Sequence, residues 1–335
     1  MGENKHNSPQ EKVKKLLNGD RRTAARLIST VENQPGEAGE LMKFVYPHTG
    51  KAMIIGITGA GGSGKSSLIN HLIERFRHQD KTVGVLAVDP SSPFSGGALL
   101  GDRIRFQKHS TDSGVYIRSM GSRGYLGGLA RATTDVVRIM EAMGNEVIII
   151  ETLGVGQDEI DIIHIAQTCL LILTPGMGDD IQAMKAGIME ISDLIVLNKA
   201  DLDGAGVALR TLEATAHYAL PKEENGWAPK IIPTVAVATR SDGIQGIDEL
   251  VEAILEHQTY IRDNRMLAEI QSQRIEQELS LIFKDEVEKL VFAGLKGTGK
   301  KRQYIDAIMS GTNDPYSVVQ EVLNLFKDGL TSPLQ

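Results

Sequence analysis

The chain has 335 residues, which is longer than a typical single-core domain, so we expect one large domain with appended helices or two domains. Its composition, 41% hydrophobic and 24% charged, excludes a disordered, collagenous or low-complexity chain. A formal net charge of -7 gives no general attraction for nucleic acid, so any anionic ligand must be held locally. The apolar runs are too short to cross a bilayer, and the single cysteine, Cys169, cannot form an internal disulfide, so we expect a cytoplasmic protein without membrane insertion.

The first residues carry a helix-start pattern: Ser8 as the N-cap, Pro9 at the first helical position and Glu11 three residues after the cap. Short helices should continue to about Val45. Beyond them, short β-branched runs alternate with segments of helical length and spacing, which predicts a doubly wound, mostly parallel α/β sheet. The expected strands are 53–57, 83–88, 147–150, 170–173, 194–197 and 231–237, and the expected helices between them are 67–76, 133–143, 181–191 and 207–219.

After about His257 the pattern changes to long helix. Residues 262–291 are rich in Glu, Gln, Lys, Leu and Ile without proline, and a second helix is expected at 315–327. The glycines in 294–300 are interpreted as a helix-breaking loop rather than as a second phosphate site. We therefore predict three parts: an N-terminal helical extension (1–47), a nucleotide-binding domain (48–257) and a C-terminal helical arm (258–335).

A phosphate-binding motif follows the first expected strand directly. The pattern G-x-x-x-x-G-K-[ST] lets successive backbone N–H groups point inward, and the next helix presents its positive end to phosphates. Lys65 would reach the β- and γ-phosphates, and the Ser66 hydroxyl would bind Mg²⁺. The alternative is a glycine-rich turn that only caps a helix. The predicted phosphate-site residues are Gly59, Ala60, Gly61, Gly62, Ser63, Gly64, Lys65, Ser66 and Ser67.

A dinucleotide-binding turn is a competing interpretation of the same glycines. Gly59, Gly61 and Gly64 satisfy G-x-G-x-x-G, and Asp89 ends the second expected strand, where such enzymes keep a ribose-binding acid. Lys65 and Ser66 argue against it, because that turn needs neither a cation nor a magnesium ligand.

The tetrapeptide Asn198, Lys199, Ala200, Asp201 follows another expected strand and has the pattern N-K-x-D. The Asp201 carboxylate can accept both N–H donors on guanine's Watson–Crick edge, and adenine lacks this pair, so GTP is preferred to ATP. The alternative is that Asp201 only caps the next helix. A third base contact is expected after the last strand, at Val237 and Ala238, although the serine of the usual Ser-Ala turn is missing there.

The run from Val147 ends in Glu151 with Gly154 three residues later, which is the D-x-x-G spacing with glutamate in place of aspartate. Glu151 would act on Mg²⁺ directly or through water, and the Gly154 N–H would sense the γ-phosphate. Asp89 and Asp102 are further candidate magnesium ligands, and either could instead form a turn.

These motifs together resemble the MeaB/ArgK group of P-loop GTPases, which are chaperones of adenosylcobalamin-dependent methylmalonyl-CoA mutase and related acyl-CoA mutases. The resemblance covers about 21–257 and includes further stretches at 88–97, 101–105, 126–128, 151–157 and 175–187. It implies a GTPase, alternating between GTP and GDP, whose nucleotide state gates cofactor delivery to the mutase and release of damaged cofactor. It also implies a homodimer joined partly by C-terminal helical arms.

The acid-rich segment after the fourth buried strand has no role in phosphate, magnesium or base binding as assigned above. The resemblance favours a third switch there, at Asp179, Asp180, Gln182 and Lys185, and the alternative is ordinary helix capping. Slow intrinsic hydrolysis is also expected, because Val155 follows Gly154 where many small GTPases place a water-orienting glutamine.

Two other functions stay open at this point. A kinase could transfer the γ-phosphoryl group to a small substrate, although no additional acid-rich substrate motif is present. A nickel-insertion GTPase shares the glutamate of the magnesium motif, although the chain has no His-rich tract or cysteine pair.

Overall fold

The computed structural model describes residues 8–90, 105–122, 128–152, 165–176, 192–219, 226–238, 243–264, 266–297 and 299–331. The chain forms two compact units, Met1–Arg274 and Ile275–Gln335. The division into extension, nucleotide domain and arm remains a prediction about roles.

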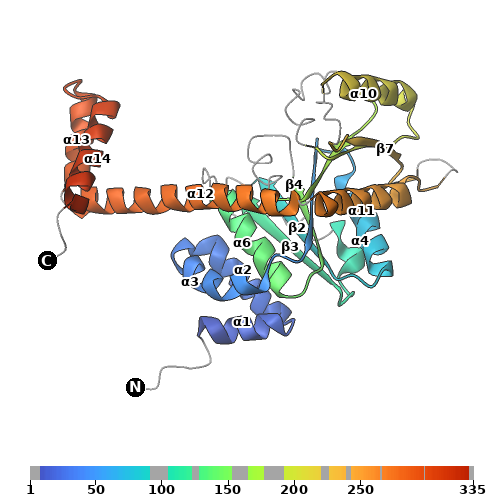
Figure 1. Ribbon diagram of the computed structural model, residues 1–335, viewed down its shortest axis with the longest axis horizontal. Helices are drawn as coiled ribbons and strands as arrows, with labels where there is room; N and C mark the ends of the chain where they lie inside the picture. Colours follow the sequence, from blue (N-terminus) through green and yellow to red (C-terminus); the bar gives the residue numbers. More distant parts are fainter. Residues whose placement is uncertain are drawn as a thin grey trace. The chain divides into compact units, whose positions relative to one another are not determined.

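A parallel sheet forms the centre of the first unit (Figure 1). Its strands lie in the order β3-β2-β4-β1-β5-β6-β7, and each of the pairs between them is parallel. The fold is thus the predicted α/β class. The strands are β1 (Met53–Gly59), β2 (Val83–Pro90), β3 (Val115–Ser122), β4 (Val147–Thr152), β5 (Thr168–Leu173), β6 (Leu194–Asn198) and β7 (Lys230–Thr234).

The continuous apolar runs form strands because both faces of the sheet are covered. In β1, Ile54 packs into the hydrophobic cluster on one face and Ile55 into the cluster on the other. The same alternation holds for Ile148 and Ile149 in β4. A strand buried on both sides has no polar face to show, which is why its sequence lacks alternation.

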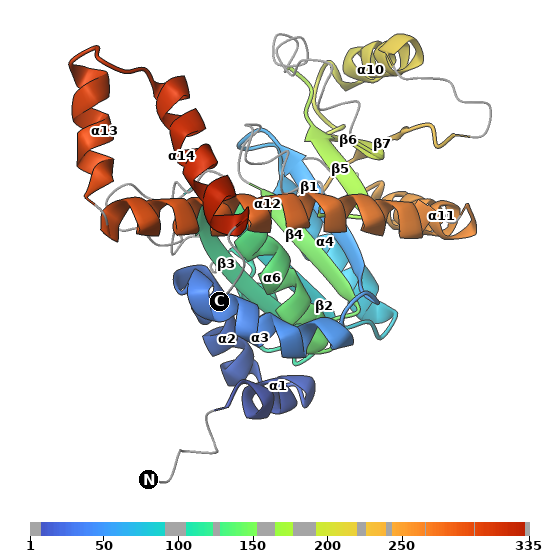
Figure 2. The same cartoon turned by 60° about the vertical axis from the view of Figure 1, so that its left-hand side comes forward.

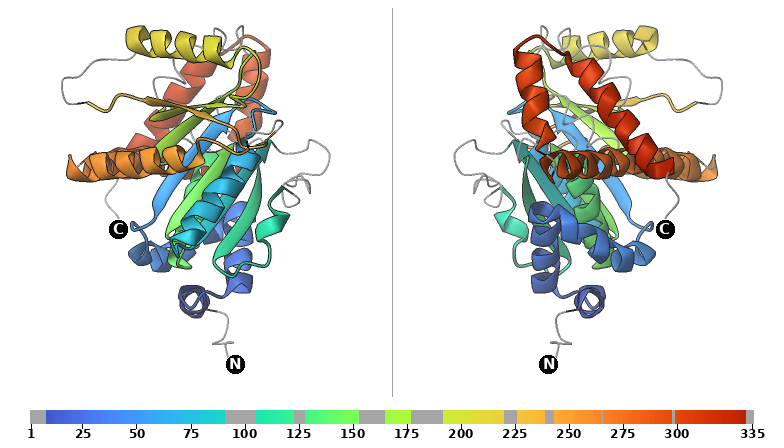
Figure 3. Two further views of the ribbon diagram at one scale, coloured as in Figure 1. Left: turned by 90° about the vertical axis from the view of Figure 1, so that its right-hand side faces the viewer. Right: turned by 90° about the vertical axis from the view of Figure 1, so that its left-hand side faces the viewer.

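Helices cover the two faces differently (Figures 2 and 3). On one face, α4 (Lys65–His78) and α11 (Ile247–Asp263) pack against each other and the sheet. On the other face, α6 (Gly128–Ala142) is covered in turn by three N-terminal helices, and α10 (Ala205–Ala219) buries Leu212 against β5 and β6. The N-terminal helices are α1 (Pro9–Leu17), α2 (Arg21–Asn33) and α3 (Pro35–Val45), followed by the 3₁₀ turn η2 (Tyr46–His48).

The N-terminal helices start and dock as their sequence dictates. Ser8 caps α1, and its hydroxyl accepts a hydrogen bond from the Glu11 N–H at 3.3 Å, so the predicted helix start is confirmed. Arg118 of β3 pairs with Glu32 of α2, and the buried side chains of α1 to α3 share one apolar cluster with α6. This extension therefore belongs to the same compact unit as the sheet.

The strand β3 and the helices α11 and α13 (Lys300–Met309) were not predicted. The strand β3 mixes polar residues such as Arg118 and Ser119 with apolar ones, because it lies at the end of the sheet and pairs with β2 alone in the described chain. The helix α11 lies mostly before His257, where no helix was expected, and it ends at Asp263, ahead of the long helix that begins at Met266. The last strand ends at Thr234 rather than at 237, and the expected helix 181–191 lies outside the described residues.

The second unit is helical. It contains most of α12 (Met266–Gly297), then α13 (Lys300–Met309) and α14 (Pro315–Thr331), which confirms the predicted helix that starts at Pro315. The predicted glycine break also occurs, because α12 ends at Gly297 and Gly299 adopts a φ of 71° as the N-cap of α13. Within the described parts of the chain, no helix has both the length and the hydrophobicity that a membrane span requires.

A buried polar cluster attaches α11 to the amino ends of β5 and β6. His257 lies with Nδ1 2.9 Å from the Thr168 hydroxyl and Nε2 3.3 Å from the Asp193 carboxylate. Since Gln258 donates to the same Thr168 oxygen at 2.8 Å, the hydroxyl hydrogen is free to reach Nδ1, and Nε2 carries the ring hydrogen of the neutral form. Burial lowers the pKa of His257 to about 4, although the Asp193 carboxylate lies beside the ring.

This cluster predicts acid sensitivity. Between pH 6.5 and about 4 the unfolded chain binds a proton at His257 that the folded chain excludes, so the free energy of unfolding should fall as pH falls through this window. The full shift corresponds to about 3 kcal/mol. Chemical denaturation of the native protein and His257→Gln across this pH range measures it, and the variant should show a shallower slope. Equal slopes would contradict the assignment.

Candidate nucleotide-binding site

The phosphate loop connects β1 to α4, with β4 on one side of β1 and β5 on the other. Two of its glycines are required by close approach. A Cβ on Gly59 would lie 2.3 Å from the Ile172 carbonyl oxygen, and a Cβ on Gly64 would lie 2.2 Å from Asn198 Nδ2. Gly64 also has a φ of 93°, in the left-handed region. The sequence pattern therefore corresponds to a loop pressed against its neighbours.

Lys65 is held across the loop. Its side chain begins in the first turn of α4, and the residue is only 4% exposed. The ammonium donates hydrogen bonds to the carbonyl of Gly59 at 2.6 Å and to that of Ala60 at 3.0 Å. A buried cation is thus fixed at the loop, where the sequence predicts phosphate binding.

Ser66 and Glu151 lie together, although 85 residues separate them. The Ser66 hydroxyl donates to Glu151 Oε1 at 2.8 Å, and Glu151 is 1% exposed. The register explains the meeting, because Glu151 pairs with Ile57 of β1 at the carboxyl edge of the sheet. A hydroxyl and a carboxylate oxygen are hard donors that fit Mg²⁺.

Asp89 is the second-last residue of β2 at the same edge, two residues beyond Ala87, which pairs with Glu151. Only its backbone is described. The other predicted residues around the phosphates and switches lie outside the described residues, namely Asp102, Gly154, Asp179, Asp180, Gln182 and Lys185.

Asn198 joins the phosphate loop to the segment after β7. Its Nδ2 donates to the Ser63 carbonyl at 2.8 Å, and its Oδ1 accepts from the Thr234 hydroxyl at 3.1 Å and from the Ala236 N–H at 3.2 Å. The side chain is 2% exposed. The Asn198 amide therefore holds the phosphate loop against the segment after β7, and its contact with a nucleotide stays a prediction.

The remaining base-site residues surround that link. Lys199 is exposed and has a φ of 59°, a left-handed conformation that turns the chain from β6 towards Asp201. The Ala200 N–H donates to the Thr234 carbonyl at 3.0 Å, which ties this turn to β7. Val237, 61% exposed, and Ala238 follow on the β7 side. The two predicted base segments therefore leave neighbouring strands.

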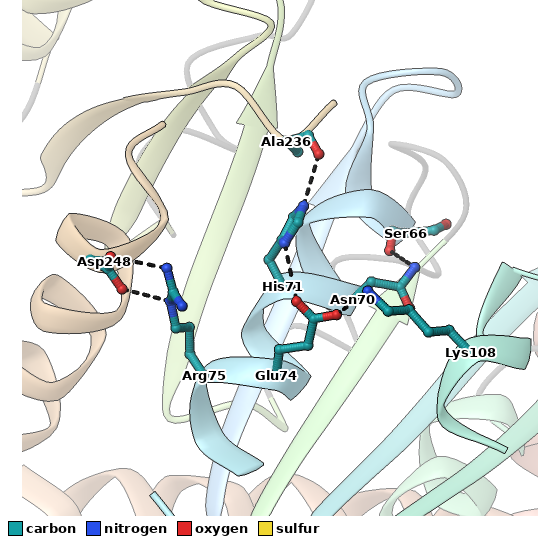
Figure 4. A network of polar contacts seen from close by, with 8 residues as sticks. All are labelled: Ser66, Asn70, His71, Glu74, Arg75, Lys108, Ala236 and Asp248. Carbon is teal, nitrogen blue, oxygen red and sulfur yellow. Dashed lines mark hydrogen bonds and ion pairs between the residues drawn. The ribbon is translucent and has the colours of Figure 1, made fainter. Parts of the chain in front are cut away.

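Sequence analysis missed two polar residues on α4. His71 Nε2 lies 2.9 Å from the Ala236 carbonyl, and Glu74 lies 3.5 Å from the other ring nitrogen (Figure 4). A histidine and a glutamate on a helix match no nucleotide-binding motif, and the contact joins residues 165 positions apart. No pattern in the sequence alone could have revealed it.

Comparison with known proteins gives a family match over most of the chain. The family model described as "Methylmalonyl Co-A mutase-associated GTPase MeaB" matches residues 24–296. A relative from Pyrococcus horikoshii, named as a GTPase, is 47% identical over 316 residues, covering 93% of this chain and 96% of the relative. The GTPase ArgK of Escherichia coli is 30% identical over 318 residues, covering 93% and 95% of the two chains.

Among solved structures, the crystal structure of a LAO/AO transport system kinase superposes with a TM-score of 0.69. It covers 98% of this chain and 99% of the other at 24% identity. At that identity the likeness shows a shared fold alone.

The close approach at Gly64 generates a prediction. Gly64→Ala should weaken GDP binding about tenfold or more, because the methyl group meets Asn198 and the left-handed backbone costs a non-glycine residue about 1–2 kcal/mol. Calorimetric titration with GDP measures the loss. Gly39→Ala is the matched control. Gly39 lies in α3, and no atom lies within 4 Å of the place that the added methyl group would take, so this variant should bind GDP normally. Normal GDP affinity in Gly64→Ala would contradict the geometry.

Proposed function

The chain belongs to the MeaB family of methylmalonyl-CoA mutase-associated GTPases, and we propose that it gates an adenosylcobalamin-dependent acyl-CoA mutase by binding and hydrolysing GTP. It is a P-loop GTPase, as its relatives are. In this proposal the nucleotide state controls cofactor loading and the release of damaged cofactor, and the protein works beside its mutase in the cytoplasm.

One observation carries the assignment of the site. The Asn198 amide bonds to Ser63 of the phosphate loop and to Ala236 of the segment after β7, so one buried side chain fixes both ends of a nucleotide site. Phosphates would lie at the N–H groups of 60–66, and the base between Asp201 and Val237–Ala238. A nucleoside triphosphate needs both parts at a set spacing, and this link supplies the spacing.

The chemistry then follows from the side chains at the loop. Lys65 would exchange its contacts with the Gly59 and Ala60 carbonyls for the β- and γ-phosphate oxygens. Ser66 and Glu151 would hold Mg²⁺, with Asp89 and Asp102 as further ligands. The metal, when bound, offsets negative charge on the phosphates. Gly154 would sense the γ-phosphate through its N–H.

Regulation is assigned to the rest of the chain. Val155 stands where many small GTPases place a water-orienting glutamine, so we expect slow intrinsic hydrolysis that the mutase accelerates. Asp179 and Lys185 form a third switch that passes the nucleotide state to the mutase. The arm, 258–335, joins two copies into a homodimer.

The partner itself is tested by capture. The full chain loaded with a non-hydrolysable GTP analogue is used as bait in a lysate of its own organism, and the bound proteins are identified. An acyl-CoA mutase supports the proposal. A small-molecule kinase complex, or a hydrogenase or urease precursor in place of a mutase, would overturn it.

Base choice gives a sharp prediction. Asp201→Asn should weaken GTP binding about tenfold or more and improve xanthosine triphosphate binding, because the amide donates where xanthine has an acceptor in place of the guanine amine. Competition binding with GTP, xanthosine triphosphate and ATP measures this. Asp203→Asn is a matched control two residues away and should keep the native preference. Equal GTP and ATP affinity in the native protein would remove the guanine assignment.

The proposed switch at Asp179 and Lys185 gives another testable prediction. Single-turnover GTP hydrolysis should rise about tenfold or more when an adenosylcobalamin-dependent acyl-CoA mutase is added. Lys185→Ala should keep GTP affinity within about twofold and lose this response, because its role lies in transmission rather than binding. If Lys185→Ala still responds to the mutase, these residues cap a helix and the switch assignment fails.

A further inference from the structure

The solvent side of α4 carries polar residues with helical spacing. Its other side is closed, since Leu68, Ile69, Leu72 and Ile73 are fully buried against the sheet. Asn70, His71 and Glu74 instead reach neighbouring segments of the chain (Figure 4). The helix that begins at the phosphate loop thus also contacts the segment after β7.

All four backbone polar groups of Val235 and Ala236 are satisfied. The Val235 N–H donates to the Gln245 carbonyl at 3.0 Å, and the Gln245 N–H donates back to the Val235 carbonyl at 3.2 Å. The Ala236 N–H donates to Asn198 Oδ1 at 3.2 Å. The fourth group, the Ala236 carbonyl, lies 2.9 Å from His71 Nε2.

The direction of this last hydrogen bond is fixed. A carbonyl oxygen can only accept, so Nε2 of His71 carries the hydrogen. Ala236 is 4% exposed, so loss of the donor would leave its carbonyl in a site with little access to water. The side chain of His71 is 18% exposed, which allows it to be replaced without opening the apolar side of α4.

Glu74 lies beside the other nitrogen of the ring. Its Oε2 lies 3.5 Å from His71 Nδ1, and its Oε1 pairs with Lys108, which is 70% exposed. Partial burial alone would raise the pKa of Glu74, but the hydrogen bond and charge of Lys108, together with His71 and His109, hold it below its ordinary value. Glu74 is therefore ionised near neutral pH. Among the contacts of the described residues, Lys108 pairs with Glu74 and not with the base segment.

We propose that His71 is a positioning residue for guanine recognition: its hydrogen bond to Ala236 sets where Val237 and Ala238 meet the base. The proposal rests on the base site assigned above. GTP and GDP carry the same base, so both should depend on His71 equally. The phosphate loop is held by Asn198 and Lys65 instead, so the hydrolytic step at saturating GTP should not depend on it.

The test compares four variants of the full chain. His71→Ala should weaken GDP and a non-hydrolysable GTP analogue by the same factor, about five- to tenfold, as expected for one lost hydrogen bond to a buried acceptor. In hydrolysis KM should rise by that factor while kcat stays within about twofold. His71→Gln should restore affinity, because its amide nitrogen takes the place of Nε2, whereas His71→Asn should not. Lys108→Ala is the matched control and should bind normally.

The outcomes separate this inference from the function it builds on. If Asp201→Asn does not change base preference, the base site itself has been misassigned. If Asp201→Asn does change it, the inference is overturned by unchanged nucleotide affinity in His71→Ala, by equal behaviour of the glutamine and asparagine variants, or by an equal loss in Lys108→Ala. The Gln and Asn pair decides the question even if His71→Ala fails to fold.

Discussion

The close contact between the phosphate loop and its two neighbours is the constraint on which the site depends. Gly59 presses on β5 and Gly64 presses on Asn198 at distances that leave no room for a side-chain carbon. Because Asn198 then bonds to both Ser63 and Ala236, the loop, the end of β6 and the segment after β7 are fixed together. Packing thus fixes the loop proposed for the phosphates against the segment proposed for the base.

The sequence predicted most of the sheet for a clear physical reason. Strands such as β1 and β4 are buried on both faces, so their uninterrupted apolar runs stand out from everything else in the chain. The strand β3 lacks this signal because it lies at the end of the sheet, and the boundary between α11 and α12 lacks it because both segments favour helix. The local sequence pattern therefore predicts buried elements well and the boundaries between elements poorly.

The candidate site was likewise predicted only in part. The residues predicted to contact the ligand, such as Lys65, Ser66 and Asp201, stand at motif spacings, so the sequence alone is enough to propose them. Residues that hold those groups in place follow no spacing. Asn198 was predicted from its motif, but its hydrogen bonds to the protein were not. His71 was missed because its partner, Ala236, lies 165 positions away in the segment after β7. Residues that position a site are brought together by the fold, so a sequence motif cannot identify them.

The cluster at the amino ends of β5 and β6 contains the chain's single tryptophan. Trp227 packs on His257 with ring centroids 4.7 Å apart, and its indole N–H donates to the Asp193 carbonyl at 2.8 Å. The edge proposed to bind the nucleotide lies at the opposite ends of the same strands. Tryptophan fluorescence therefore reports from one defined place, and it can show, without an attached dye, whether nucleotide binding changes the amino ends of β5 and β6.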